Sequence, residues 1–363
     1  MEATLPLEAV RGDPEVEVAP DVECLRTGIV NCFLVGLPGA GDRQWVLVDT
    51  GMIGFTHSVV RAAAERFGAD SRPAAIVMTH GHFDHVGGLR ELAEAWDVPV
   101  YAHPLELPYL TGESAYPPPD PTVGGGMMAR LSPLFPRGPF DVGGRARPLP
   151  ADGSVPGMPG WRWIFTPGHS PGHVSFFRDE DRVLIAGDAF VTTKQESLLA
   201  VLEQRPEIHG PPMYYTTDWN AARDSVRELA ALEPEVAATG HGRPLRGEPM
   251  RAALHLLASD FDALAVPEDG RYVRAPAISD ETGVVSVPPP VRDLFPLLLG
   301  LGAAAVLGVA VGVATRRRRD YVPQREWEEL DEELEFEFAP EAGWEEQSEE
   351  EEIDYSGASH VRR

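Results

Sequence analysis

Short apolar runs of strand length alternate with stretches of helical spacing through the middle of this chain, and together they predict one large domain of mixed strands and helices. Strands are expected where a run is short and rich in β-branched residues, and helices where apolar residues recur every three or four positions. The runs that predict strands lie at residues 22–35, 44–49, 74–78, 98–103, 174–177, 183–188 and 236–238. The patterns that predict helices lie at residues 56–68, 89–96, 220–232 and 249–266.

Residues 104–160 follow neither pattern, because prolines at 117–121 and glycines at 124–126 interrupt any continuous helix or strand. A long irregular segment inside a compact domain is often a wall or lid of a site. Its apolar residues either line a substrate pocket or only pin the segment to the domain, and the sequence leaves both open. The candidates are Tyr109, Tyr116, Met127, Met128, Leu134 and Phe135.

The C-terminal part has a different composition. Residues 267–293 form a proline-rich, polar stretch that predicts a linker after a domain at 21–266. Residues 294–314 carry no charge over 21 positions, enough for a helix to cross a hydrocarbon core of about 30 Å. The pattern therefore predicts a single-pass membrane protein.

The orientation of that predicted span is ambiguous. Four arginines at 316–319 place the C-terminal side in the cytoplasm by the positive-inside rule. Residues 1–20, which predict a disordered N-terminus, contain no secretory signal. That absence, together with cysteines too few for a disulfide framework, slightly favours a cytoplasmic catalytic domain.

Charge is unevenly distributed along the chain. The net charge is −26, and residues 320–363 contain 17 acidic residues against three arginines. The basic start and acidic remainder of 315–363 predict a disordered tail suited to a basic partner. The acidic balance of the whole chain argues against a nucleic-acid-binding surface.

Metal-binding residues are concentrated directly after the apolar run 74–78. His80, His82, Asp84 and His85 fall within six positions, ahead of the predicted helix at 89–96. Imidazole and carboxylate are ligands of zinc and similar ions. His80 and His82 project to the same side of an extended backbone and suit one ion, whereas Asp84 and His85 follow a turn and suit a second.

This His-x-His-x-Asp-His motif resembles that of the metallo-β-lactamase superfamily, and the resemblance covers residues from about 20 to 265. It implies a four-layer αββα sandwich with a metal site along one edge. It also implies three further ligands in order along the chain. The matching positions are His169 in the Thr-Pro-Gly-His motif, Asp188 in Gly-Asp and His241 in Thr-Gly-His-Gly.

The same resemblance implies two divalent metal ions, of which zinc is the leading choice and manganese or iron the alternatives. One ion would be held by His80, His82 and His169, the other by Asp84, His85 and His241, with Asp188 shared. Asp49, which ends the run at 44–49, would support the site from behind. His173 would lie near the metals without binding them.

Hydrolysis of a small ester, thioester or lactone is the leading functional hypothesis, because water bridging two cations ionises near neutral pH and becomes a nucleophile. Asp84 is the candidate proton shuttle, and Tyr214 or Tyr215 could donate to a developing oxyanion. Two alternatives stay open. One is a mononuclear-iron, persulfide-dioxygenase-like oxidoreductase with the same ligands, and the other is a scaffold with a vestigial site.

Overall fold

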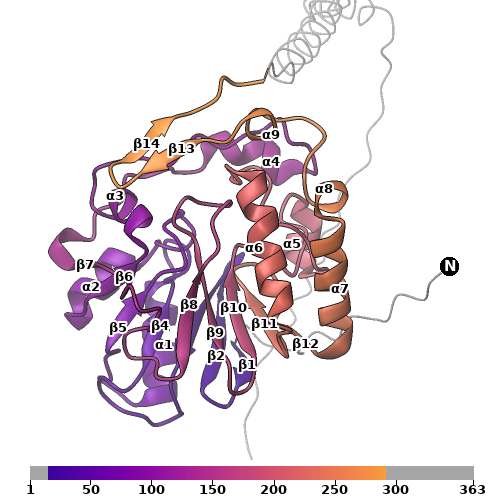
Figure 1. Ribbon diagram of the computed structural model, residues 1–363. Helices are drawn as coiled ribbons and strands as arrows, with labels where there is room; N and C mark the ends of the chain where they lie inside the picture. The colour runs from indigo at the N-terminus through magenta and orange to yellow at the C-terminus, as the bar shows by residue number, and fades with distance from the viewer. Residues whose placement is uncertain (1–14, 292–363) are drawn as a thin grey trace, which may run out of the picture. The chain divides into compact units, whose positions relative to one another are not determined.

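The computed structural model describes residues 15–291, and two sheets contain most of the strands there (Figure 1). The first sheet has the order β1-β2-β3-β4-β5-β6-β7, and the second has the order β12-β11-β10-β9-β8. The first contains β1 (Glu15–Ala19), β2 (Val22–Thr27), β3 (Val30–Val35), β4 (Val46–Val48), β5 (Ala75–Val77), β6 (Val100–Ala102) and β7 (Ala146–Pro148). The second contains β8 (Trp161–Phe165), β9 (Val174–Arg178), β10 (Val183–Gly187), β11 (Val236–Thr239) and β12 (Leu245–Arg246). A separate hairpin pairs β13 (Ile278–Asp280) with β14 (Gly283–Ser286).

Four longer helices flank the sheets, and short helical turns fill the connections. The longer ones are α1 (Thr56–Phe67), α2 (Leu89–Trp96), α6 (Trp219–Ala231) and α7 (Gly247–Ser259). The short α-helices are α3 (Leu107–Leu110), α4 (Met127–Leu131), α5 (Leu198–Glu203), α8 (Phe261–Leu264) and α9 (Arg271–Arg274). The 3₁₀ turns are η1 (Pro104–Glu106), η2 (Ser132–Leu134) and η3 (Gly143–Arg145).

Three separate clusters of buried apolar side chains define the layers. In one, α1 and α2 pack on the first sheet, with Phe67 of α1 and Leu47 of β4 among its members. In the second, the two sheets pack on each other. In the third, α6 and α7 cover the outer face of the second sheet. Successive side chains of β3 point to opposite faces of the first sheet. Phe33 belongs to the cluster between the two sheets, and its neighbour Leu34 belongs to the cluster under α1 and α2. The predicted mixed α/β fold with more than one sheet is confirmed.

Parallel pairing brings the metal motifs to one edge. Strand β4 is parallel to β5, and β10 is parallel to β11. The carboxyl ends of parallel neighbours lie on the same side, so the residues that follow β4 and β5 meet there, as do those that follow β10 and β11. The sheets are tied together at this edge, where the amide of Val174 donates to the carbonyl of Thr79 at 2.9 Å.

Two predicted segments differ from the structure. The run at 22–35 is two strands, because the backbone turns at Gly28 with φ 70°, a conformation that glycine adopts readily. Residues 15–19, within the segment 1–20 predicted to be disordered, form β1 and pair with β2. Because the turns between these strands are so short, the apolar pattern does not show where one strand ends and the next begins.

The predicted linker at 267–293 also contains structure. Helix α9 and the β13–β14 hairpin lie within it, above α3 and α4 (Figure 1). Tyr272 is buried, and its hydroxyl donates to the carbonyl of Pro118 at 2.6 Å. The hydroxyl of Tyr109 donates to that of Ser279 at 3.1 Å. Both contacts are hydrogen bonds between polar groups, so a polar composition does not distinguish this packed segment from a linker.

The predicted membrane localisation is corrected. Within residues 15–291, no helix combines the length and apolar character that crossing a bilayer requires. The longest helices there, α6 and α7, have 13 residues each, or about 20 Å at 1.5 Å per residue. The apolar segment 294–314, on which that prediction rested, and the acidic segment 315–363 both lie outside the described residues.

Candidate metal centre

Histidine and aspartate side chains converge where the two sheets meet. His80, His82, Asp84 and His85 follow β5, and all four are buried, with Asp84 the most accessible at 7%. The other three predicted ligands, which come from the second sheet, are equally buried. They are His169 before β9, Asp188 directly after β10 and His241 after β11.

These seven residues form three overlapping sets, each with ligand atoms within 4.8 Å of one another. The sets are His80–His82–His169, His80–His85–Asp188 and Asp84–His85–His241. Asp188 lies between them, since its Oδ2 is 3.1 Å from His241 Nε2 and 3.4 Å from His169 Nε2. The structure therefore brings together every residue that the sequence predicted as a ligand.

Several polar atoms in this cluster have no hydrogen-bond partner. His80 Nε2, His85 Nε2 and Asp188 Oδ1 are fully buried and unpaired. A buried polar atom without a partner costs about 1–3 kcal/mol, and a divalent cation among these atoms removes that cost. Two rings also meet nitrogen to nitrogen, His82 Nδ1 and His169 Nε2 at 2.9 Å. The donor set fits divalent metal ions.

Asp49 stands behind the cluster, as the sequence predicted. Its Oδ1 accepts from the amide of Thr79 at 2.8 Å, and its Oδ2 accepts from the Thr79 hydroxyl at 2.7 Å. Oδ2 also lies 2.8 Å from His85 Nδ1. A carboxylate can only accept, so His85 carries its proton on Nδ1 and leaves Nε2 free as a ligand atom.

The same reasoning fixes two more tautomers. His241 Nδ1 lies 2.8 Å from the carbonyl of Ile29 and donates to it, so its Nε2 is free to bind a cation. His173 Nε2 accepts from the amide of Asp188 at 2.8 Å. Its Nδ1 therefore donates to Thr166 Oγ1 at 2.9 Å. His173 orients the shared aspartate and is not itself available as a ligand.

The electrostatics divide the histidines into two classes. Burial lowers the pKa of His80 and His82 well below 6.5 and that of His169 to about 3. Neutral imidazole is the form that binds metal. Burial also opposes charge on His85, yet the carboxylates of Asp188 and Asp49 raise its pKa well above 6.5. The raised pKa favours a second proton on His85, whose positive charge balances the two carboxylates. A cation bound beside His85 would supply that positive charge instead.

Two tyrosine rings pack against His82. The Tyr215 ring lies 4.5 Å from the imidazole between centroids, and the Tyr116 ring also lies at 4.5 Å. The Tyr214 ring lies tilted beside that of Tyr215 at 5.4 Å and meets Phe135 edge-on at 6.0 Å, both between centroids. Of the two tyrosines predicted near the metals, Tyr215 is therefore the one against a ligand histidine.

The irregular segment contributes only some of its predicted lining residues. Tyr116 and Phe135 face the metal loop, and Phe135 stacks on Phe83 at 5.3 Å. Tyr109 is buried behind Tyr116, and Met128 is buried in the core beneath α6 and α7. Met127 and Leu134 are 52% and 79% exposed and do not pin the segment to the core.

Sequence reasoning missed Glu106. Its side chain is fully buried and bonded to both histidine loops. A lone glutamate after a strand carries no metal-binding pattern. The signal available was its place in the sequence His-Pro-Leu-Glu-Leu-Pro, where a charged residue sits among apolar ones.

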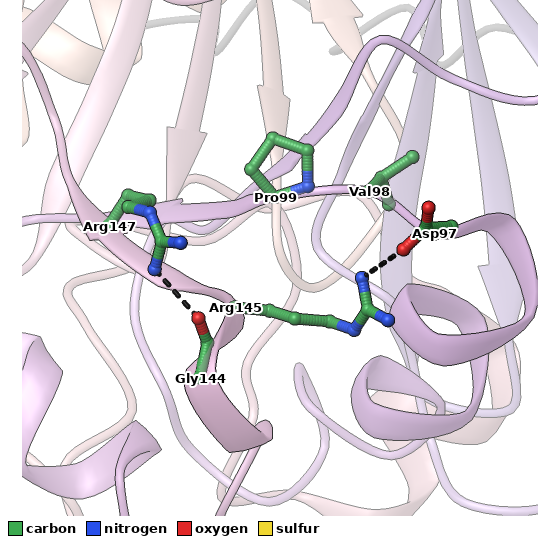
Figure 2. A pocket seen from close by; sticks show the side chains of 6 residues that line it. All are labelled: Asp97, Val98, Pro99, Gly144, Arg145 and Arg147. Carbon is green, nitrogen blue, oxygen red and sulfur yellow. Dashed lines mark hydrogen bonds and ion pairs between the residues drawn. The ribbon is translucent and has the colours of Figure 1, made fainter.

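A surface depression of about 490 Å³ lies away from this cluster, beside β6 and β7 (Figure 2). Arg145 donates to Asp97 at 2.7 Å. Arg147 donates to the carbonyl of Gly144 at 2.8 Å. Both guanidinium groups are thus engaged by neighbours, and the depression adds nothing to the metal centre.

Comparison with known proteins shows the family to which the chain belongs. The probable metallo-hydrolase YflN of Bacillus subtilis (strain 168) is 46% identical over 260 residues, which cover 72% of this chain and 98% of that protein. The probable metallo-hydrolase YybB of the same organism is 31% identical over 205 residues, which cover 56% of this chain and 78% of that protein. The crystal structure of the metallo-beta-lactamase family protein TTHA1429 from Thermus thermophilus matches with a TM-score of 0.45 at 24% identity, covering 68% of this chain and 81% of that one. The family model described as "Metallo-beta-lactamase superfamily" matches residues 25–241, and the chain belongs to that superfamily.

Proposed function

We propose that this metallo-hydrolase of the metallo-β-lactamase superfamily cleaves a small ester, thioester or lactone with two divalent metal ions, zinc being the first choice. The observation that carries the proposal is the set of buried, unpaired ligand atoms His80 Nε2, His85 Nε2 and Asp188 Oδ1. The names of the two Bacillus subtilis relatives, both probable metallo-hydrolases, support hydrolysis.

The ligand assignment follows the three sets. His80, His82 and His169 would hold one ion, Asp84, His85 and His241 would hold the other, and Asp188, which forms a third set with His80 and His85, would be shared. When bound, such ions polarise a carbonyl oxygen and make water nucleophilic near neutral pH. Asp49 and the Ile29 carbonyl keep the ligand nitrogens of His85 and His241 directed inward.

Asp84 is the proposed proton carrier. It is the most exposed of the seven side chains, and burial raises its pKa above 3.8. Its Oδ2 lies 3.4 Å from His241 Nε2. A carboxylate beside both the site and the solvent can accept a proton and return it to the leaving group.

The aromatic side chains limit what can approach. Tyr215 and Tyr116 enclose His82, and Phe83 and Phe135 extend this apolar wall. Such a wall excludes water and favours a small, largely uncharged acyl group. Tyr214 or Tyr215 is the proposed donor to a developing oxyanion, and the Tyr215 hydroxyl, which donates to the carbonyl of Pro136 at 3.4 Å, would have to turn from it to do so.

Metal analysis of the full chain, purified without added metal, tests the proposal. We expect close to two zinc or manganese ions per chain and hydrolysis of at least one compound in a panel of esters, thioesters and lactones. His82→Ala and Asp188→Ala should each abolish turnover in folded protein. One iron per chain, with oxygen uptake on persulfides, would refute the hydrolase assignment.

A further inference from the structure

Glu106 joins the two loops that carry the histidines. It ends η1, directly beyond β6, and its side chain is fully buried. Oε1 accepts from the Ser170 hydroxyl at 2.7 Å and from the amide of Gly172 at 2.8 Å. Oε2 accepts from the amide of Gly81 at 3.0 Å and from the Tyr116 hydroxyl. One carboxylate thus receives four donors.

The donors lie directly beside ligand positions. Gly81 stands between His80 and His82, and Ser170 follows His169. The loops arise from different sheets, one after β5 and the other between β8 and β9. The carboxylate therefore holds two loops of different sheets at the spacing that His80, His82 and His169 need to share one ion.

One loop packs so closely on Glu106, and the other on its partner Tyr116, that neither glycine leaves room for a side chain. A Cβ at Gly172 would lie 2.8 Å from Glu106 Cγ, and one at Gly81 would lie 2.7 Å from the Tyr116 hydroxyl. The Tyr116 hydroxyl also accepts from the Gly81 amide at 2.9 Å. That bond keeps the Tyr116 ring edge-on against His82, so the glutamate also positions the imidazole through this neighbouring ring.

The second proposed metal set is anchored independently of Glu106. His85 is held by Asp49, and His241 is held by the carbonyl of Ile29. Neither contact involves Glu106 or its four donors. Loss of the glutamate should therefore weaken one set and spare the other.

We propose that Glu106 is a positioning residue that sets the metal affinity of the His80–His82–His169 set alone. This inference rests on the proposed function, because it assumes two metal ions. Glu106→Gln is the most specific substitution, since it keeps the size of the side chain and replaces one of its two acceptor oxygens with an NH₂ group. The hydroxyls of Ser170 and Tyr116 can turn to accept from the new amide group, but a backbone N–H cannot.

The test uses the full chain in two backgrounds that isolate the sets. His241→Ala disrupts the second set and leaves the three-histidine set, whereas His169→Ala does the reverse. Metal-free protein of each kind is titrated with Co²⁺ in competition with a chelator, and the dissociation constant is measured by absorption. We expect Glu106→Gln to raise that constant about 10- to 100-fold in the His241→Ala protein and to leave it unchanged in the His169→Ala protein.

The control is Glu113→Gln, an exposed glutamate of the same irregular segment, which should change neither constant. Ser170→Ala should weaken the three-histidine set in the same direction but less, and it stands in if Glu106→Gln does not fold. Equal weakening of both sets would indicate general loosening and overturn the inference. An unchanged constant in the His241→Ala background, for Glu106→Gln or for its stand-in, would overturn it too. A wild-type chain that binds no metal would instead refute the proposed function.

Discussion

Replacing Asp49 by asparagine should flip the tautomer of His85 and weaken one metal set. Asp49 is fully buried and receives three donors, two from Thr79 and one from His85 Nδ1. Asparagine offers one acceptor oxygen and one NH₂ group. If the oxygen stays on the backbone amide of Thr79, the NH₂ group faces the His85 ring. Nδ1 must then accept, and the proton moves to Nε2, the atom that should bind the cation.

The magnitude follows from the negative charge that is lost. Hydrogen bonds to charged groups contribute about 1.5–3 kcal/mol each and neutral ones about 0.5–1.5 kcal/mol, so the free energy of unfolding of the metal-free variant should fall by about 1–1.5 kcal/mol for each bond that becomes neutral. The wrong tautomer should cost about 10- to 100-fold in metal affinity, or about 1.4–2.7 kcal/mol. Asparagine tolerates the left-handed backbone of this position, φ 56°, so backbone strain should contribute little.

Chelator competition on Asp49→Asn, with thermal unfolding of the metal-free protein, measures both effects. Asp70→Asn is a matched control, because Asp70 is exposed and has the same left-handed conformation, φ 63°. We expect one of two metal equivalents to weaken in Asp49→Asn and neither in Asp70→Asn. Wild-type affinity for both ions in Asp49→Asn would refute the argument from the His85 tautomer.

Three further predictions concern packing, pH and metal removal. Gly240→Ala should lower metal content and turnover at least tenfold, because its Cβ would lie 2.1 Å from Asp188 Oδ1, whereas Gly144→Ala meets open space and should match wild type in both. Burial lowers the pKa of His103 to about 4. The unfolded chain, with a pKa of about 6.5, therefore binds more protons between these values, and the stability due to His103 is present above pH 6.5 and lost as pH falls to 4. His103→Asn, which keeps an acceptor for the following turn, should make the fall in Tm between pH 6.5 and 4 shallower, and an unchanged slope would contradict the assignment. Removing metal with a chelator should lower the free energy of unfolding by about 2.7 kcal/mol at a free metal concentration of 100 Kd, whereas an unchanged Tm would show that the cluster binds no stabilising ion.

The sequence by itself determined the candidate ligand residues and the class of fold. His80, His82, Asp84 and His85 are readable because they crowd into one loop after a strand, and Asp188 also directly follows a strand. A motif and a periodic pattern depend only on residues that are close in the sequence, so both can be read before the fold is known. Parallel strands then bring such loops to one edge of a sheet.

Only the tertiary structure decided which other groups surround those ligands. Glu106 is more than twenty residues from His82 and more than sixty from His169, and only the meeting of two sheets lets it bond to both of the loops that carry them. The carbonyl of Ile29 has no sequence signal at all, since every residue has one. Leu134 is exposed although Phe135 beside it faces the metal loop. Burial and long-range hydrogen bonds depend on how distant segments pack, and the order of residues along an irregular segment does not record that packing.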